Sequence, residues 1–316
     1  MAAQDTGPGR PGIWHAGAVL ALLMAFASIS TDFYLPAMPA MAGALGAGDG
    51  AIEFTITGYL VGLSLGQLVW GPVADRFGRR LPVAAGLGLF ILGSAGCAAA
   101  QGVPGIVGWR ILQALGASAA IVLSRAMVRD LYSGARAAQV MSVLMAVMTV
   151  APVIAPSVGA LVSGSFGWRA IFVLLALIGI ATLAALFTLP ETLRPAERSP
   201  SLRLGTAFAT YGRLARDPMV MGHAVVVGMF YAGMYGYVAG TPAAFIGHHG
   251  VSPQAYGLLF ASCVLGITGG NLANARLAAR FGPMRCLQAG TAGAAVSSRK
   301  AMAARAAMAG SRSRAA

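Results

Sequence analysis

The stretch that decides the fold of this 316-residue chain is Gly71-Pro72-Val73-Ala74-Asp75-Arg76-Phe77-Gly78-Arg79-Arg80. It lies between two apolar runs, 54–70 and 81–100, each about long enough to cross a bilayer as a helix. A charged turn held between two membrane helices needs polar partners, so we expect Asp75 to accept hydrogen bonds from a helix N-terminus or from an arginine. The glycines allow the two helix ends to approach closely. Three positive residues are expected to keep the turn on the cytoplasmic side: Arg76, Arg79 and Arg80.

The composition points to an integral membrane protein. Hydrophobic residues make up 57% of the chain and charged residues only 10%, whereas a soluble domain carries about 25% charged residues. The net charge of +13 does not indicate nucleic-acid binding, because the arginines fall in short clusters between apolar runs rather than on one face. Metal-ligand spacing, a disulfide framework, a phosphate-binding loop and a catalytic set are all missing from the sequence. We therefore expect no metal, no cofactor and no enzyme activity.

Apolar runs long enough to span a bilayer recur along the chain. They lie at 14–34, 54–74, 81–101, 105–124, 139–163, 168–189, 218–246 and 255–275. Helices are expected rather than barrel strands, because backbone groups in lipid must be satisfied within the segment and alternating strand patterns are absent. The predicted fold class is therefore an all-α integral membrane protein.

Positive charge alternates from one loop to the next. Arginines occur in 71–80, in 125–136, in the Pro-, Ser- and Arg-rich linker 190–217 and after the eighth run, whereas 35–53, 102–104 and 247–254 contain neither Lys nor Arg. Arg169 is the one exception. The positive-inside rule therefore predicts that the N-terminus and the linker are both cytoplasmic.

Four further segments carry a family resemblance. They are Ser30–Pro39 (STDFYLPAMP), Arg110–Gly116 (RILQALG), Ala151–Gly159 (APVIAPSVG) and Leu189–Leu193 (LPETL). With the charged turn, which resembles the loop between helices 2 and 3 of the major facilitator superfamily of secondary transporters, they resemble the Bcr/CflA group of bacterial drug/proton antiporters, the bicyclomycin-resistance type. The resemblance covers residues from about 14 to 285.

The resemblance implies a protein of the bacterial inner membrane that exports small drug-like compounds by alternating access, driven by inward proton flow. Its partners would be the drug, protons and the lipid bilayer, and the oligomeric state is not fixed. The resemblance also implies a cytoplasmic gating motif. Its residues here are Gly71, Asp75, Arg76, Gly78, Arg79 and Arg80.

Two ionisable residues inside the apolar runs are candidates for proton coupling. A charged carboxyl near the outer end of the first span is costly, so Asp32 is suited to load and release a proton as solvent access alternates. The alternative is a solvated residue that closes the helix before Pro36. Arg110 in the fourth span must pair with a carboxylate or a backbone carbonyl if it is buried, and the matching arginine of the family is implicated in proton coupling. The alternative is an anchor that snorkels outward. Gln113, one turn on, is expected on the same side and is a substrate-cavity candidate.

The fifth span carries Pro152, Pro156 and Gly159. Proline bends a helix, and glycine allows a close neighbour. In the family this pattern is an antiporter signature, and the alternative is an ordinary kinked span. Tyr231 and Tyr235 in the seventh span are further candidates for a drug cavity, because aromatic side chains adapt to varied apolar ligands. Their alternative is a lipid-facing or packing role.

The predicted organisation departs from the family toward the C-terminus. It comprises a cytoplasmic N-terminus 1–13, a six-helix bundle 14–189, a cytoplasmic linker 190–217, a partial second bundle 218–296 and a low-complexity basic tail 297–316. The family has twelve helices in two related halves, whereas eight to nine are visible here. We therefore expect a C-terminally truncated major facilitator fold, with a tail that arises from a frameshift or an altered stop. The open functional alternatives are an inactive transporter remnant and a membrane protein that binds a ligand or partner without transporting it.

Overall fold

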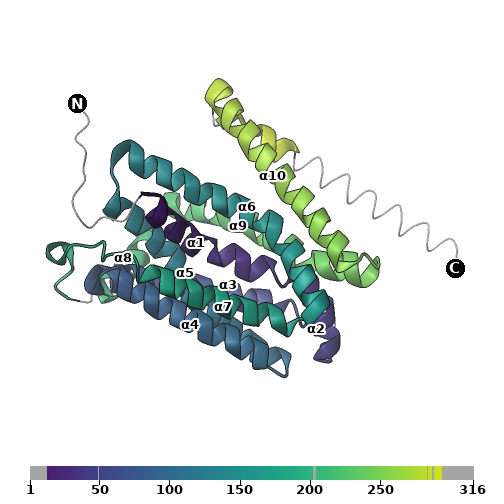
Figure 1. Ribbon diagram of the computed structural model, residues 1–316. Coiled ribbons are helices and arrows are strands. Elements are labelled where there is room, and N and C mark those ends of the chain that lie inside the picture. Colours follow the sequence, from purple (N-terminus) through teal and green to yellow (C-terminus); the bar gives the residue numbers. More distant parts are fainter. Residues whose placement is uncertain (1–12, 49, 202–203, 283, 287, 294–316) are drawn as a thin grey trace. The chain divides into compact units, whose positions relative to one another are not determined.

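The computed structural model describes residues 13–48, 50–201, 204–282, 284–286 and 288–293. Within these residues the regular structure is entirely helical, and eight helices are long and apolar enough to cross a membrane (Figure 1). Their bounds are α1 Ile13–Asp32, α3 Phe54–Phe77, α4 Arg80–Ala99, α5 Val103–Leu131, α6 Gly134–Phe166, α7 Arg169–Leu186, α9 Pro218–Pro242 and α10 Pro253–Phe281. Each matches a span predicted from the apolar runs, so the all-α membrane class is confirmed. The predicted tail 297–316 and nearly all of 1–13 lie outside the described residues.

Shorter helices occupy the connections. They are η1 Leu35–Ala37, α2 Met38–Ala44, η2 Pro195–Glu197, α8 Leu204–Leu214 and η3 Ala243–His248. Two of them, η2 and α8, lie in the linker predicted between the sixth and seventh spans. The linker is therefore partly helical.

The charged turn is much shorter than the ten residues of the sequence motif. α3 continues through Asp75 and Arg76 to Phe77, and α4 begins at Arg80. Only two residues connect the helices, and one of them, Gly78, has a φ of 88°. This left-handed conformation is readily available to glycine and produces the sharp reversal. Most of the motif is therefore the last two turns of a helix rather than a loop.

Close helix packing builds the bundle. α5 packs against α3, α4 and α1, while α4 also packs against α7 and α1 against α6. The face of α3 that meets α5 carries glycines at a four-residue spacing, Gly58, Gly62 and Gly66, and a Cβ added at Gly62 would overlap the backbone of Ile111. The missing side chains let the two backbones touch, as is common in membrane helix pairs. This stripe was present in the sequence and was not used in our prediction.

Contacts within the chain define two compact parts, which divide between Ser262 and Cys263 inside α10. The first part contains the helices from α1 to α9 and the start of α10. In this part α9 buries only Val238, Thr241 and Pro242. The domain boundary at the linker 190–217 stays a prediction.

Candidate functional site

A buried cation lies at the centre of the candidate site. Arg110, on α5, is fully buried, and its Nη1 donates hydrogen bonds to the Ser30 carbonyl at 3.0 Å and to Gln113 Oε1 at 2.7 Å. The guanidinium carbon lies 4.4 Å from the ring centre of Tyr34 and 4.2 Å from that of Tyr59. Among the described residues, none of the carboxylates forms an ion pair with it. A backbone carbonyl and two aromatic faces stabilise this cation instead, and its side chain does not extend outward to the membrane surface.

Gln113 extends the cluster toward α4. Its Nε2 donates to the Ser94 hydroxyl at 2.7 Å, and that hydroxyl donates to the Phe90 carbonyl at 2.7 Å. Gln113 therefore lies on the same side of α5 as Arg110, as expected from the spacing. The side chain is fully buried. Its place in a substrate cavity stays a prediction.

The carboxylate candidate lies at the end of α1. Asp32 is the last residue of that helix and is 8% exposed, so it is not a solvated residue at the membrane surface in this conformation. Tyr59 and Tyr235 both lie close enough to interact electrostatically with it. Tyr59 also lies against the Arg110 guanidinium, and Arg110 bonds the carbonyl of Ser30, two residues before Asp32.

α6 reaches the same region through its glycine. A Cβ added at Gly159 would overlap the carbonyl oxygen of Phe33, the residue after Asp32. Pro152 and Pro156 lie inside α6, which is one helix from Gly134 to Phe166. The three residues of the predicted antiporter pattern therefore belong to the helix that packs against the end of α1.

The two tyrosine candidates of α9 differ in position. Their rings are stacked with centres 6.4 Å apart. Tyr231 is 49% exposed, whereas Tyr235 is half-buried and near Asp32. Tyr235 is therefore the more enclosed of the two side chains, and a place in a drug cavity stays a prediction for both.

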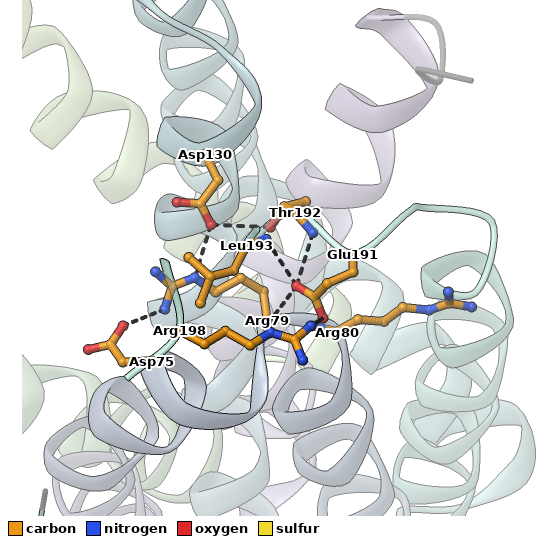
Figure 2. A network of polar contacts seen from close by, with 8 residues as sticks. All are labelled: Asp75, Arg79, Arg80, Asp130, Glu191, Thr192, Leu193 and Arg198. Atoms are coloured by element: carbon orange, nitrogen blue, oxygen red, sulfur yellow. Dashed lines mark hydrogen bonds and ion pairs between the residues drawn. The ribbon is translucent and has the colours of Figure 1, made fainter. Parts of the chain in front are cut away.

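A second polar cluster lies where α3 ends and α4 begins, and Figure 2 shows its side chains converging from several helices. Arg79 donates from Nε to Asp130 Oδ2 at 2.9 Å and from Nη1 to Asp75 Oδ1 at 2.8 Å. The Thr192 hydroxyl donates to the same oxygen of Asp130 at 3.2 Å. Burial acts to lower the pKa of Arg79, but its hydrogen bonds to Asp75 and Asp130 outweigh burial, and the pKa is raised. This arginine is therefore a permanent cation that joins α3 to α5.

Glu191 supplies the N-terminal cap of α4. Its carboxylate accepts the backbone N–H groups of Arg79 at 2.8 Å and of Arg80 at 3.2 Å (Figure 2). A negative charge is favourable at this position because the first N–H groups of a helix have no partner within it. Of the two roles that we considered for Asp75, pairing with an arginine is confirmed, and Glu191 takes the other.

The remaining arginines of the turn bind the segment that follows α7. Arg76 donates to the carbonyls of Ser199 and Pro200. Arg80 donates to the Phe187 carbonyl at 2.9 Å and lies over the ring of the same residue. Of the two glycines in the motif, Gly78 lies against Glu191, whereas a Cβ at Gly71 would meet nothing within 4 Å. The expected close approach therefore occurs at Gly78 and not at Gly71.

Comparison with known proteins identifies the family. The family model described as Major Facilitator Superfamily matches residues 20–302. The chain belongs to the Major Facilitator Superfamily. It is therefore a multi-pass membrane protein of a transporter family.

Several curated members of the superfamily are similar to this chain. It is 39% identical over 267 residues to the uncharacterized MFS-type transporter YdgK of Bacillus subtilis (strain 168), covering 84% of this chain and 65% of that protein. It is 38% identical over 242 residues to a chloramphenicol resistance protein of Pseudomonas aeruginosa, covering 76% and 56%. It is 28% identical over 264 residues to a bicyclomycin resistance protein homolog of Haemophilus influenzae, covering 83% and 66%. The chain thus spans two thirds or less of the length of these relatives.

A solved structure of the superfamily shares the fold. The bacterial homolog of the human lysosomal transporter Spinster, in its inward-facing and unoccupied conformation, aligns with a TM-score of 0.68 and 16% identity over 86% of this chain and 63% of that one. At this identity the likeness concerns the fold alone.

Sequence reasoning missed three polar residues of this superfamily member. Glu191 was noted within Leu189–Leu193 without a role. Asp130 is the single acid in the arginine-rich segment 125–136, and that isolation was a usable signal. Ser94 lies in an apolar run, where a lone serine usually bonds its own helix, and no signal in the sequence joined it to Gln113.

Proposed function

We propose that this member of the Major Facilitator Superfamily is a drug/proton antiporter of the Bcr/CflA type in the bacterial inner membrane. One observation carries the proposal: Asp32 and Arg110 are both buried among spanning helices, and Arg110 donates a hydrogen bond to the carbonyl of Ser30, two residues before Asp32 in α1. Ionisable groups at such positions are costly and mark proton and substrate pathways. The relatives named for chloramphenicol and bicyclomycin resistance support a drug as the cargo.

In this proposal Asp32 exchanges a proton with the side of the membrane to which the site is open. The deprotonated carboxylate favours polar or cationic groups of a drug, and protonation removes that attraction. Drug and proton then compete for one group, which is the simplest basis for exchange. Arg110 is held near this end of α1 by its hydrogen bond to the Ser30 carbonyl. Its Nε and Nη2 make no hydrogen bond with a described residue, and we propose them as donors when Asp32 is ionised.

The cluster around Arg79 is proposed as the cytoplasmic gate. It connects α3, α4, α5 and the segment after α7 through charged hydrogen bonds. Such a network allows these helices to move as one body when access alternates. The arginine-rich loops support a cytoplasmic location for this cluster, for the N-terminus and for the linker 190–217.

The remaining candidates receive roles around Asp32. Gly159 keeps α6 against the end of α1, and Pro152 and Pro156 shape the helix that does so. Tyr235, with Tyr231 and the deeper Gln113, is proposed to line the path of the drug. The support is that Tyr235 is partly buried and close enough to Asp32 to interact with it electrostatically.

Drug accumulation in cells tests the proposal. In bacteria that lack their own exporters, cells expressing the 316-residue chain are expected to accumulate less labelled chloramphenicol than empty cells. A protonophore and the Asp32→Asn substitution should each restore accumulation, while Asp32→Glu should retain part of the efflux. Asp217→Asn is the matched control, because Asp217 only accepts backbone N–H groups at the start of α9 and asparagine caps a helix equally well.

Two outcomes count against the proposal. Unchanged efflux by Asp32→Asn, inserted at the normal level, removes Asp32 from the mechanism. Absence of efflux by the correctly inserted parent chain favours the second candidate, a membrane protein that binds a partner without transporting. The broad exposed apolar surface of α9, which includes Val226, Met229 and Phe230, is the observation that favours this second candidate.

A further inference from the structure

The linker helix α8 is amphipathic. Its larger apolar residues, Leu204, Phe208, Tyr211 and Leu214, are spaced by four, three and three and so form one stripe along the helix. Phe208 is 49% exposed, and its ring packs edge to face on Tyr211 with centres 5.9 Å apart. Ala209 and Arg213 lie on the opposite side, since each residue turns the helix by about 100°. α8 therefore has one aromatic, apolar side and one small or polar side.

Protein covers little of α8. None of its residues is buried, and the Tyr211 hydroxyl donates a hydrogen bond to the Leu68 carbonyl of α3 at 3.3 Å. A cleft of about 200 Å³ lies between the two helices. Its lining residues are Pro72, Asp75, Ser199, Thr206, Ala207 and Thr210. Helices of this length are marginal in water without tertiary contacts, so α8 needs a further partner for its apolar stripe.

The neighbouring surface indicates which partner this is. Around the carbonyl that Tyr211 binds, α3 leaves apolar side chains exposed, namely Leu65, Leu68 and Val69 at 50%, 40% and 36%. α3 is a candidate membrane span, and apolar side chains on the outside of a span face lipid. The apolar stripe of α8 therefore lies beside exposed apolar surface of α3.

The charges around α8 are suited to anionic lipid. Arg213 in its last turn and Arg216 just beyond are exposed. Asp217, which follows Arg216, is occupied by the backbone N–H groups of Met219 and Val220, and Asp75, across the cleft from α8, is paired with Arg79. An apolar, aromatic stripe on one side and arginines on the polar side are the usual features of a helix lying in the plane of an anionic membrane surface.

We propose that α8 is such an interfacial helix, bound to the anionic surface of the bilayer beside α3. Its stripe enters the boundary between headgroups and acyl chains, and its arginines contact lipid phosphates. The same linker accepts hydrogen bonds from Arg76 at Ser199 and Pro200. Membrane binding by α8 thereby holds the linker next to the Arg79 cluster.

Spin labels on the full chain in vesicles test the depth of α8. The natural cysteines Cys97, Cys263 and Cys286 are replaced by serine, and single cysteines are placed at Phe208, at Leu204 on the same stripe and at the adjacent control Ala209. In vesicles of phosphatidylcholine and phosphatidylglycerol, labels at 204 and 208 should collide severalfold more with oxygen relative to a water-soluble nickel chelate than the label at 209. Depths of about 5–10 Å below the headgroups are expected.

The result that overturns the lipid assignment is equally specific. Labels at 208 and 209 that are equally accessible to the nickel chelate place the stripe in water. A label at 208 that is immobile and shielded from both reagents means that protein, and not lipid, covers it. The label at 208 replaces an aromatic ring that is expected to bind the membrane, and this replacement could itself weaken binding. The label at 204 keeps Phe208, so it reports on the membrane binding of the intact ring.

A second arm tests the charge requirement. Removing phosphatidylglycerol from the vesicles should shift the Leu204 label toward water, and Arg213→Gln with Arg216→Gln should abolish the difference between the two vesicle types. Equal depths of the parent chain in both vesicle types would contradict a role for anionic lipid.

Discussion

Arg79 bonds two carboxylates whose surroundings differ. The side chain of Asp130 is 16% exposed, whereas that of Asp75 is 60% exposed. Because the pKa of Arg79 is raised, its contribution to stability is complete at every pH below the ordinary pKa of arginine and is lost only as pH rises through the raised value. The guanidinium therefore adds no pH dependence near neutrality, and the two carboxylates can be compared directly.

We predict that Asp130→Asn lowers the free energy of unfolding by about 1.5–3 kcal/mol, as for other hydrogen bonds to charged groups. Asp75→Asn should lower it by less than about 1 kcal/mol, because exposed pairs contribute little. Denaturation in mixed detergent micelles measures both values. Equal losses for the two variants would mean that Asp130 is not the stronger of the two partners of Arg79.

The bond between Gln113 and Ser94 gives a second prediction for single residues. Gln113→Leu and Ser94→Ala should each lower the free energy of unfolding by about 1–3 kcal/mol, since each leaves a buried polar group without its partner. The double variant should cost less than the sum of the two, with a coupling of at least about 0.5 kcal/mol. Additive losses would show that the two side chains do not interact.

At the level of elements, the contact between α6 and α1 depends on the size of residue 159. Gly159→Val should force α6 away from Phe33 and lower the free energy of unfolding by about 1–3 kcal/mol, the usual cost of overpacking. Because Asp32 precedes Phe33, drug efflux should also fall. Unfolding in micelles and accumulation in cells measure the two effects.

Gly164→Val on the same helix is the control for this prediction. The nearest neighbour of a Cβ at Gly164 is the flexible end of the Gln254 side chain at 3.4 Å, so this variant should be nearly normal in both assays. A normal Gly159→Val variant would show that the approach of α6 to Phe33 is not required.

The helices were predictable because apolar length decides whether a segment spans a membrane. All eight spans followed from that rule. Some predicted limits differ from the observed ones by several residues; for example, the run 105–124 corresponds to α5, which continues to Leu131. The rule could not locate the end of α3, because charged residues at a membrane surface are compatible with helix or loop. It also gave no information on α8, whose short stripe is visible only when the linker is examined at helical spacing.

The candidate site was predictable in part. Asp32 and Arg110 stood out as charges in apolar runs, and their burial agrees with that signal. The partners were not predictable, because they come from helices distant in sequence. Glu191 caps a helix that begins 111 residues before it in the chain, and only the packing of α7 beside α4 creates that contact.

At the scale of the whole molecule, the proposed antiporter combines a buried proton carrier, a charged cytoplasmic cluster and a drug path. Coupling is the central claim, because burial of Asp32 explains exchange only if its proton moves when the drug moves. An uncoupled drug carrier, or a protein that binds without transporting, needs none of these proton movements.

Proton flux in proteoliposomes tests this claim most directly. The purified 316-residue chain is reconstituted with a pH-sensitive dye inside, and chloramphenicol is added outside without a pH gradient. The account predicts that drug entry drives protons out, so the internal pH rises with the parent chain and stays constant with Asp32→Asn. An equal rise with Asp32→Asn, or drug entry through the parent chain without any change of internal pH, would contradict it.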